Sequence, residues 1–422
     1  MVPLNHQNRK PMSFGDSLEL INGTIVLNDK VDNCNLFIKN GVITKIGVDV
    51  GEHNKIDASG MFVLPGLINS HTHLGETVFK NLISFKGLYE YIRKTDDINT
   101  KLRSNTSFVR AASGYKSIVD FIKEGITTIC AARCATECDN AGLRSFSGYI
   151  FMKSKKLQHF IDEFNEAFYD YINNIKTSKL SKPILFLHSI EYVDSDTLEL
   201  ISKLHKTYKL PFTVHLSETK YGEAKVRKNF GCSSTELLNS YGLINESALL
   251  VHCCYTSETD LQLIKKKKAN VILCPTSNKR LNNRTPSLKT LLKLGINTSI
   301  ATDGLATNLS PSLLAEYKYL AKIENINMEN KSFAMLTTNP AKALGIKAGA
   351  IQKGNLSDLI LLQPEKGYKF NGNIPSLFWH SKIKYVIVGG KPILLMDKYT
   401  TLNLSEVKAK FDLARTMVFK AV

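Results

Sequence analysis

The sequence predicts an α/β fold, a (β/α)8 barrel joined to a small β-sandwich module that both ends of the chain build together. Two observations predict the barrel. Apolar runs of strand length follow one another through the middle of the chain, among them "ITTICAA", "PILFLHS", "ALLVHCC" and "NTSIATDG". Between them, segments such as "SDTLELISKLHKTYK" and "TPSLKTLLKLG" carry apolar residues at the i, i+3, i+4, i+7 spacing of helices. Repeated strand–helix units form a parallel sheet, and eight of them close into a barrel.

A third observation predicts the module. Short β-rich runs separated by turns fill residues 17–63, and similar runs, "AGAIQKGNLSDLILLQ" and "KIKYVIVGGKPILLMDKY", lie near the other end. Asn-Gly pairs at 22–23 and 40–41 stand between apolar runs, which is a hairpin signal. We therefore expect the first strands of the module over 1–63, the barrel over 64–347, and the remaining strands with a terminal helix over 348–422.

Composition is that of a soluble globular protein. Of the 422 residues, 43% are hydrophobic and 22% are charged. No apolar run reaches the ~18 residues that a membrane span needs. The opening segment "MVPLNHQNRKPMSFGDS" also lacks the apolar stretch of a secretory signal. We expect a cytoplasmic protein with no membrane partner.

The formal net charge of +17 is the most unusual global property of the chain. Such a charge can attract nucleic acid or anionic ligands. However, lysines and arginines are spread throughout, and the run "KKKK" at 265–268 falls where a predicted helix ends, which suits the helix dipole. No basic patch interleaved with aromatic residues supports nucleic-acid binding. We expect a solvated surface with a modest bias toward anionic ligands.

Eight cysteines are scattered along the chain, and three of them, Cys130, Cys134 and Cys138, recur every four residues. This spacing hints at a metal site, but no C-x-x-C pair or matching second half accompanies it. Free thiols are the simpler interpretation in a large cytosolic chain.

Polar side chains stand at the carboxyl ends of the predicted barrel strands. The segment "LPGLINSHTHLGE" places two histidines directly after an apolar run, and in total five of the ten histidines and one aspartate end such runs. Any one of them is most simply an ordinary polar residue at a strand–loop junction. Together they favour a metal site, because barrel strands bring their carboxyl ends to one mouth and because three imidazoles with a carboxylate suit Zn²⁺ or Fe²⁺. These residues are His71, His73, His188, His215, His252 and Asp303.

The order H-x-H, His, His and Asp on successive strands resembles the amidohydrolase superfamily. The segments "PGLINSHTH", "VHLSE", "LCPTSN" and "ATDG" match it in the same order over nearly the whole chain. Binuclear members carry a bridging lysine at the end of the fourth strand. Here that strand, "KPILFLHSIE", has Lys182 only at its beginning and His188 at its end, so the resemblance implies one metal ion. The motif "HLSE" resembles the mononuclear branch, which contains deaminases of S-adenosylhomocysteine, guanine and related heterocycles.

The resemblance implies a ligand set and a reaction. His71, His73, His215 and Asp303 would hold one divalent ion, Zn²⁺ or else Fe²⁺. The reaction would be hydrolytic deamination of an aminated purine, pyrimidine, pterin or nucleoside-like heterocycle by a metal-bound hydroxide.

Three catalytic roles follow from the same resemblance. Asp303 would accept the proton of the attacking water, and Glu218 would carry it to a ring nitrogen and then to the departing amine. His252 would hydrogen-bond the attacking hydroxide and stabilise the tetrahedral intermediate. The alternative for Glu218 is an exposed loop carboxylate, but its offset of three residues from His215 favours the catalytic role.

Substrate contacts are more open. His188 resembles the fourth-strand histidine that contacts substrate in related deaminases, and Arg133 at the end of "ITTICAAR" could bind a carboxylate, a phosphate or a carbonyl oxygen. The alternative for Arg133 is a surface arginine. Glu76 either contacts substrate or caps the next turn, and Ser277 with Asn278 either shapes a loop or binds directly.

The chain also departs from the family pattern. Leu273 stands where members often have histidine. The region after His73 lacks the Trp and Pro-x-Glu features of adenosine-type deaminases, so S-adenosylhomocysteine is not expected as the substrate.

Two other functions remain open: hydrolysis of a cyclic amide or a halogenated ring on the same scaffold, and a non-catalytic binding protein, which would need a broken ligand set. By analogy with related enzymes we expect a homo-oligomer.

Overall fold

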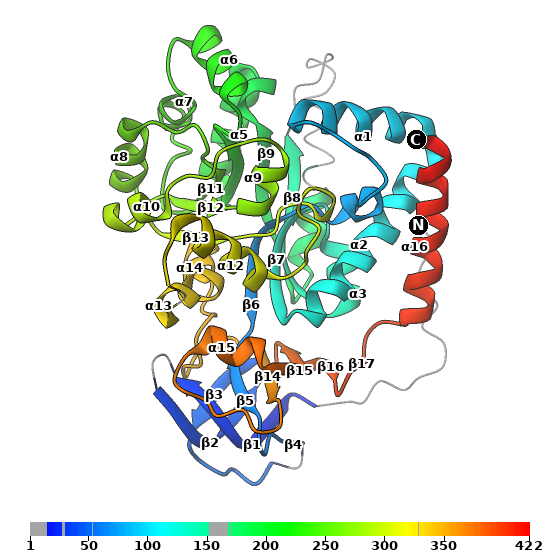
Figure 1. The fold of residues 1–422 in the computed structure, drawn as a ribbon, viewed down its shortest axis with the longest axis vertical. Coiled ribbons are helices and arrows are strands. Elements are labelled where there is room, and N and C mark those ends of the chain that lie inside the picture. Colours follow the sequence, from blue (N-terminus) through cyan, green and yellow to red (C-terminus); the bar gives the residue numbers. More distant parts are fainter. Residues whose placement is uncertain (1–14, 28–29, 53, 152–167, 169, 328) are drawn as a thin grey trace.

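A computed structural model describes residues 15–27, 30–52, 54–151, 168, 170–327 and 329–422, and two sheets organise them (Figure 1). The larger sheet has eight parallel strands that follow one another in chain order from β6 to β13. Its strands are β6 (Leu67–Thr72), β7 (Ile126–Ala132), β8 (Arg144–Phe151), β9 (Ser181–Ser189), β10 (Phe212–Leu216), β11 (Ala248–His252), β12 (Asn270–Leu273) and β13 (Thr298–Ile300). The predicted barrel is confirmed.

Hydrogen bonds link β6 to β13 and to the segment that follows it, so the eight-stranded sheet is nearly closed into a barrel. The Asp303 amide donates to the His71 carbonyl over 3.1 Å, and the hydroxyls of Ser70 and Ser299 lie 3.0 Å apart in the interior. His71 lies in β6 and Asp303 follows β13. The contacts that join these two segments therefore also bring His71 and Asp303 together at the mouth of the barrel.

Helices and short 3-10 turns cover the outside of the barrel. Those before β10 are η1 (Leu74–Phe79), α1 (Leu88–Leu102), η2 (Arg103–Asn105), α2 (Thr106–Lys123), α3 (Ala135–Ala141), η3 (Ile190–Tyr192) and α5 (Ser195–Tyr208). Those between β10 and β13 are α6 (Lys220–Phe230), α7 (Ser234–Ser240), α8 (Glu258–Lys266), α9 (Pro275–Arg280) and α10 (Leu288–Leu294). Those that follow β13 are α11 (Leu305–Asn308), α12 (Leu313–Glu324), α13 (Asn330–Phe333), η4 (Ala334–Leu336), α14 (Thr338–Ala343) and α16 (Leu404–Ala421). Helix α15 (Ile374–Trp379) lies beside the module, against β15 (Ser381–Val388). Helix α8 ends within the lysine run, as predicted.

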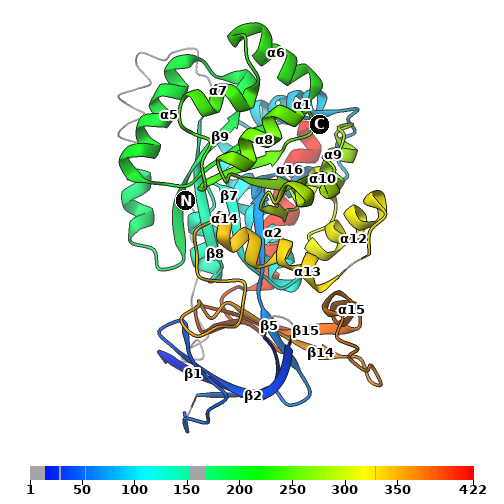
Figure 2. The same ribbon diagram turned by 90° about the vertical axis from the view of Figure 1, so that its left-hand side faces the viewer.

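The module is a second sheet of nine strands in the order β17-β16-β15-β14-β5-β1-β2-β3, with β4 beside β1, and Figure 2 shows it curling around its own core. From the N-terminal part come β1 (Ser17–Leu27), β2 (Lys30–Lys39), β3 (Val42–Ile46), β4 (Lys55–Asp57) and β5 (Phe62–Pro65). From the C-terminal part come β14 (Leu359–Pro364), β15 (Ser381–Val388), β16 (Lys391–Leu395) and β17 (Lys398–Tyr399). The antiparallel pair β5–β14 joins the two parts, which confirms a module built from both ends.

The two Asn-Gly pairs behave differently. Asn40 and Gly41 both have positive φ and connect β2 to β3, as a two-residue hairpin turn requires. The pair at 22–23 is not a hairpin turn, and that prediction was wrong: it lies inside β1 at a bulge, where Asn22 has φ of 60°. A Cβ atom on Gly23 would lie 2.9 Å from Val63, so the glycine there permits a close strand approach.

Polar contacts join the module and the terminal helix to the barrel. Arg144 and Asp358 form a buried bidentate ion pair of 2.6 Å and 3.0 Å between β8 and the residue before β14. Helix α16 (red in Figure 1) lies along α1 and α2, and Lys101 donates to the Ala421 carbonyl. None of the helices described is long and apolar enough to cross a lipid bilayer. The boundaries at 63 and 347 stay predictions.

Candidate metal and catalytic site

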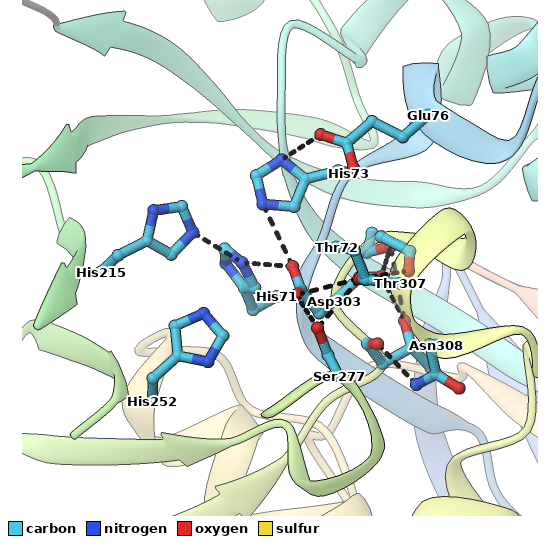
Figure 3. A network of polar contacts seen from close by, with 12 residues as sticks. His71, Thr72, His73, Glu76, His215, His252, Ser277, Asp303, Thr307 and Asn308 are labelled. Atoms are coloured by element: carbon cyan, nitrogen blue, oxygen red, sulfur yellow. Dashed lines mark hydrogen bonds and ion pairs between the residues drawn. The ribbon is translucent and has the colours of Figure 1, made fainter. Parts of the chain in front are cut away.

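Three barrel strands bring buried histidine and aspartate side chains, which are common metal ligands, to one point at the mouth (Figure 3). His71 lies in β6, His215 in β10, and Asp303 follows β13. The Nε2 atoms of His71 and His215 are 3.1 Å apart, and His71 Nε2 is 3.3 Å from Asp303 Oδ1. His73, just beyond β6, places its Nε2 3.2 Å from the same carboxylate oxygen. The predicted set of four side chains is therefore gathered in space.

The spacing of these atoms fits a shared cation. Ligands about 2.1 Å from a tetrahedral zinc ion lie about 3.4 Å from one another, close to the separations seen here. The group whose ligand atoms all lie within 4.8 Å of one another consists of His71, His215, Asp303 and His252, with His252 in place of His73. All five residues thus face the same point. The assignment of His73, rather than His252, as the fourth ligand stays a prediction.

Protonation in the site also fits a cation. Burial lowers the pKa of His71 to about 4 and holds the pKa of His215 well below its ordinary value, so both imidazoles are neutral at pH 7. Burial by itself raises the pKa of Asp303, but the hydrogen bonds of His71 and His73 hold it well below its usual range. For His73, burial is outweighed by Glu76 and Asp303, which raise its pKa to about 9. A metal ion bound by His73 would displace that proton.

A second layer of hydrogen bonds orients these groups. The His215 ring makes a 2.5 Å hydrogen bond through Nδ1 to the His188 carbonyl, which leaves Nε2 free to bind metal. Ser277 donates to Asp303 Oδ2 over 2.5 Å, and Asn278 Oδ1 lies 2.8 Å from His252 Nδ1. The "CPTSN" segment therefore orients the side chains of the site.

Glu218 reaches the site from the loop after β10. Its Oε2 lies 3.7 Å from His252 Nε2, and burial raises its pKa to about 7 although His252 opposes the shift. A carboxyl group with this pKa can take up and release a proton near neutral pH.

The backbone of the site is also strained, since Ser217, His252 and Asp303 have φ of 47°, 72° and 58°. Non-glycine residues in this conformation are costly and concentrate at functional sites.

A cavity of about 740 Å³ adjoins the metal-ligand group. The three predicted substrate contacts, His188, Arg133 and Glu76, all line it. Glu76 accepts a 2.6 Å hydrogen bond from Tyr91, and its other oxygen is 3.6 Å from His73 Nδ1. Glu76 therefore contacts both the cavity and a candidate ligand.

Several charged cavity residues were missed by the sequence analysis. Arg110 projects from α2, and Asp96 projects from α1. These two residues neither belong to a motif nor end a strand, so no signal in a single sequence marks them.

All eight cysteines are free, and Cys130, Cys134 and Cys138 are buried. No metal-ligand group that includes any of them occurs in the described part of the chain.

Comparison with known proteins finds similar chains over most of the sequence. A curated 5-methylthioadenosine/S-adenosylhomocysteine deaminase of Pyrococcus furiosus is 30% identical over 415 residues, covering 92% of this chain and 98% of the relative. A 5'-deoxyadenosine deaminase of Methanocaldococcus jannaschii is 27% identical and covers 89% of this chain and 94% of its own.

Solved structures share the fold. An adenosine deaminase from Xanthomonas campestris with bound zinc superposes with a TM-score of 0.85 at 18% identity, covering 95% of this chain and 98% of that one. A zinc complex of atrazine chlorohydrolase from Arthrobacter aurescens gives 0.84 at 15% identity, with 94% and 100% covered. The model of the amidohydrolase family matches residues 62–393. The chain belongs to the amidohydrolase family.

Proposed function

We propose that this protein is a metal-dependent hydrolytic deaminase that releases ammonia from an aminated purine nucleoside. One observation carries the proposal: a buried carboxyl group with a pKa of about 7, Glu218, stands beside His252 at the edge of a histidine–aspartate metal-ligand group. The deaminase names of the relatives support the reaction and the nucleoside class.

His71, His73, His215 and Asp303 are proposed to hold one divalent ion. The donor set of imidazoles and a carboxylate suits Zn²⁺ and allows Fe²⁺. When bound, the ion lowers the pKa of a water molecule toward neutrality and so supplies a nucleophile.

The chain's own residues move the protons. Asp303, which is ionised before the reaction, accepts the proton that the attacking water loses, and its Oδ2 accepts a hydrogen bond from Ser277. Glu218 delivers a proton to a ring nitrogen and then to the departing amine, because its pKa lets it donate and accept at pH 7. His252 hydrogen-bonds the oxygen nucleophile through Nε2, while its Nδ1 is hydrogen-bonded to Asn278 Oδ1.

The cavity supports a nucleoside with a polar group remote from the amine. Its volume lies in the usual range for small-molecule sites. Arg110 and Arg133 both line it. Burial lowers the pKa of Arg110 and the positive charge of Arg133 lowers it further, so the two charges are close. No ion pair of either arginine is found within the described ranges. We propose that they bind a carboxylate or another polar substituent of the substrate, with His188 and Glu76 nearer the reacting ring.

Hydrolysis at a cyclic amide or halogenated ring is the second candidate. Its support is the fold shared with the atrazine chlorohydrolase, which is a likeness of fold alone.

A homo-oligomer is also proposed, by analogy with related enzymes. The eight free cysteines favour a reducing compartment such as the cytoplasm.

Ammonia release from a panel of aminated heterocycles tests the proposal. We expect release from at least one of adenosine, 5'-deoxyadenosine, 5'-methylthioadenosine and S-adenosylhomocysteine. Glu218→Gln should lower the rate of release by about 10²–10⁴-fold while metal content stays unchanged. Glu19→Gln is the matched control, because Glu19 is a fully buried carboxylate in the module that should leave turnover intact. No release from any member, with metal present, would contradict the proposal.

A further inference from the structure

The Glu218 carboxyl has few hydrogen bonds of its own to set its direction. Its Oε1 is buried and has no hydrogen-bond partner in the described part of the molecule, and its Oε2 lies 3.7 Å from His252 Nε2. Proton transfer requires a carboxyl group within hydrogen-bond reach of the reacting atoms. The backbone that carries Glu218 must therefore set its direction.

That backbone is held in a left-handed turn. β10 ends at Leu216, and Ser217 turns the chain with φ of 47°. A non-glycine residue keeps this conformation only where its surroundings hold it there. Two contacts do so: the Tyr255 amide donates to the Ser217 carbonyl over 2.8 Å, and the Ser217 hydroxyl donates to Glu223 Oε2 over 2.8 Å.

Glu223 is itself firmly anchored. It lies in the first turn of α6, its side chain is buried, and it accepts a second hydroxyl, that of Ser234, over 2.6 Å. Arg227 Nε lies 3.1 Å from its other oxygen. Glu223 does not line the cavity and is not in the metal-ligand group. Its contacts connect helices α6 and α7 to the residue before Glu218.

We propose that Glu223 is a positioning residue for Glu218. By accepting the Ser217 hydroxyl, it holds the left-handed turn that points the Glu218 carboxyl toward His252. This inference rests on the proposed function, in which Glu218 transfers the proton. The Glu223 carboxylate contacts Ser217, Ser234 and Arg227, so its effect on the reaction should pass through the position of Glu218.

Kinetics of ammonia release from 5'-methylthioadenosine and adenosine, at fixed metal content, form the first test. Because misplacing a catalytic group by about 1 Å can cost about 100-fold, we expect Glu223→Ala and Ser217→Ala each to lower kcat about 10- to 100-fold. KM and bound metal should stay close to wild type. Arg227→Ala is the matched control, since it removes the ion pair but leaves the hydroxyl–carboxylate bond, and it should keep wild-type kcat.

Combination with Glu218→Gln separates this inference from the proposed function. If Glu223 acts through Glu218, Glu223→Ala should have no further effect on the residual rate of Glu218→Gln. Equal losses in both backgrounds, or a wild-type kcat for Glu223→Ala, would overturn the positioning role. Wild-type turnover of Glu218→Gln would instead overturn the proposed function.

Crystal structures of Ser217→Ala and Glu223→Ala provide a readout that needs no substrate. Ser217→Ala removes a single oxygen, so this variant should fold. We expect residue 217 to leave the left-handed region in both structures and the Glu218 carboxyl to move away from His252. An unchanged backbone and an unchanged Glu218 would refute the inference whatever the kinetics show.

Discussion

Replacing Asp358 by asparagine should destabilise the whole chain, because Asp358 is half of the buried ion pair that connects the module to the barrel. The side chains of Arg144 and Asp358 are 6% and 3% exposed, and two hydrogen bonds of 2.6 Å and 3.0 Å join them. Asp358 also accepts the Gly389 amide over 2.8 Å. The substitution leaves the guanidinium of Arg144 buried without a counter-charge.

Loss of one partner of a buried pair costs about 3–5 kcal/mol, and asparagine can still accept one hydrogen bond, so we expect a value near 3 kcal/mol. At about 2.1 cal/mol/K per residue, unfolding of the 422-residue chain carries roughly 0.9 kcal/mol/K of entropy. A loss of about 3 kcal/mol should therefore lower Tm by about 3 °C.

Denaturant unfolding at pH 7 with calorimetry measures both quantities. Asp412→Asn is the control, because Asp412 pairs with Lys408 on α16 at 55% and 78% exposure and should change stability by less than about 0.5 kcal/mol. Replacing both Arg144 and Asp358 by apolar residues should recover much of the loss. Equal effects of the two asparagine substitutions would refute the reasoning.

Three further predictions concern the site and its surroundings. Glu218→Gln should lower kcat by about 10²–10⁴-fold with bound metal unchanged, measured by ammonia release and elemental analysis. Ser277→Ala should weaken metal binding about 10- to 100-fold in a chelator competition, because Asp303 loses the donor that orients it. Burial raises the folded-state pKa of Glu316 from 4.5 to about 7, so folding favours its protonated form. That stability is present below pH 4.5 and is lost as pH rises through 7. Glu316→Gln should therefore match wild type in unfolding at pH 4 and exceed it at pH 8 by up to about 3 kcal/mol. A constant difference across this range would contradict the assignment.

Local sequence was enough to predict the barrel and the gathering of histidines and an aspartate at its mouth. Strand-length apolar runs ending in His71, His215 and His252 mark buried parallel strands, and the barrel brings their carboxyl ends together whatever the helices between them do. Asp303 was found in the same way, since it follows the last strand.

Residues that act through tertiary contacts could not be predicted. Glu223 reads as an ordinary helix glutamate, and only the packing of α6 against the loop after β10 brings it to Ser217. Arg110 reaches the cavity from the middle of α2, where no motif marks it. The Asn-Gly pair at 22–23 has the composition of a hairpin turn, but the long pairing of β1 with β2 makes it a bulge.

The metal content of the purified chain tests the central claim most directly. Elemental analysis after purification without chelators should give about one zinc or iron ion per wild-type chain and almost none in His215→Ala or Asp303→Ala. Ammonia release should fall with the metal on chelation and return when zinc or iron is added. A wild-type chain that binds no metal, or that deaminates equally well after the metal is removed, would contradict the account.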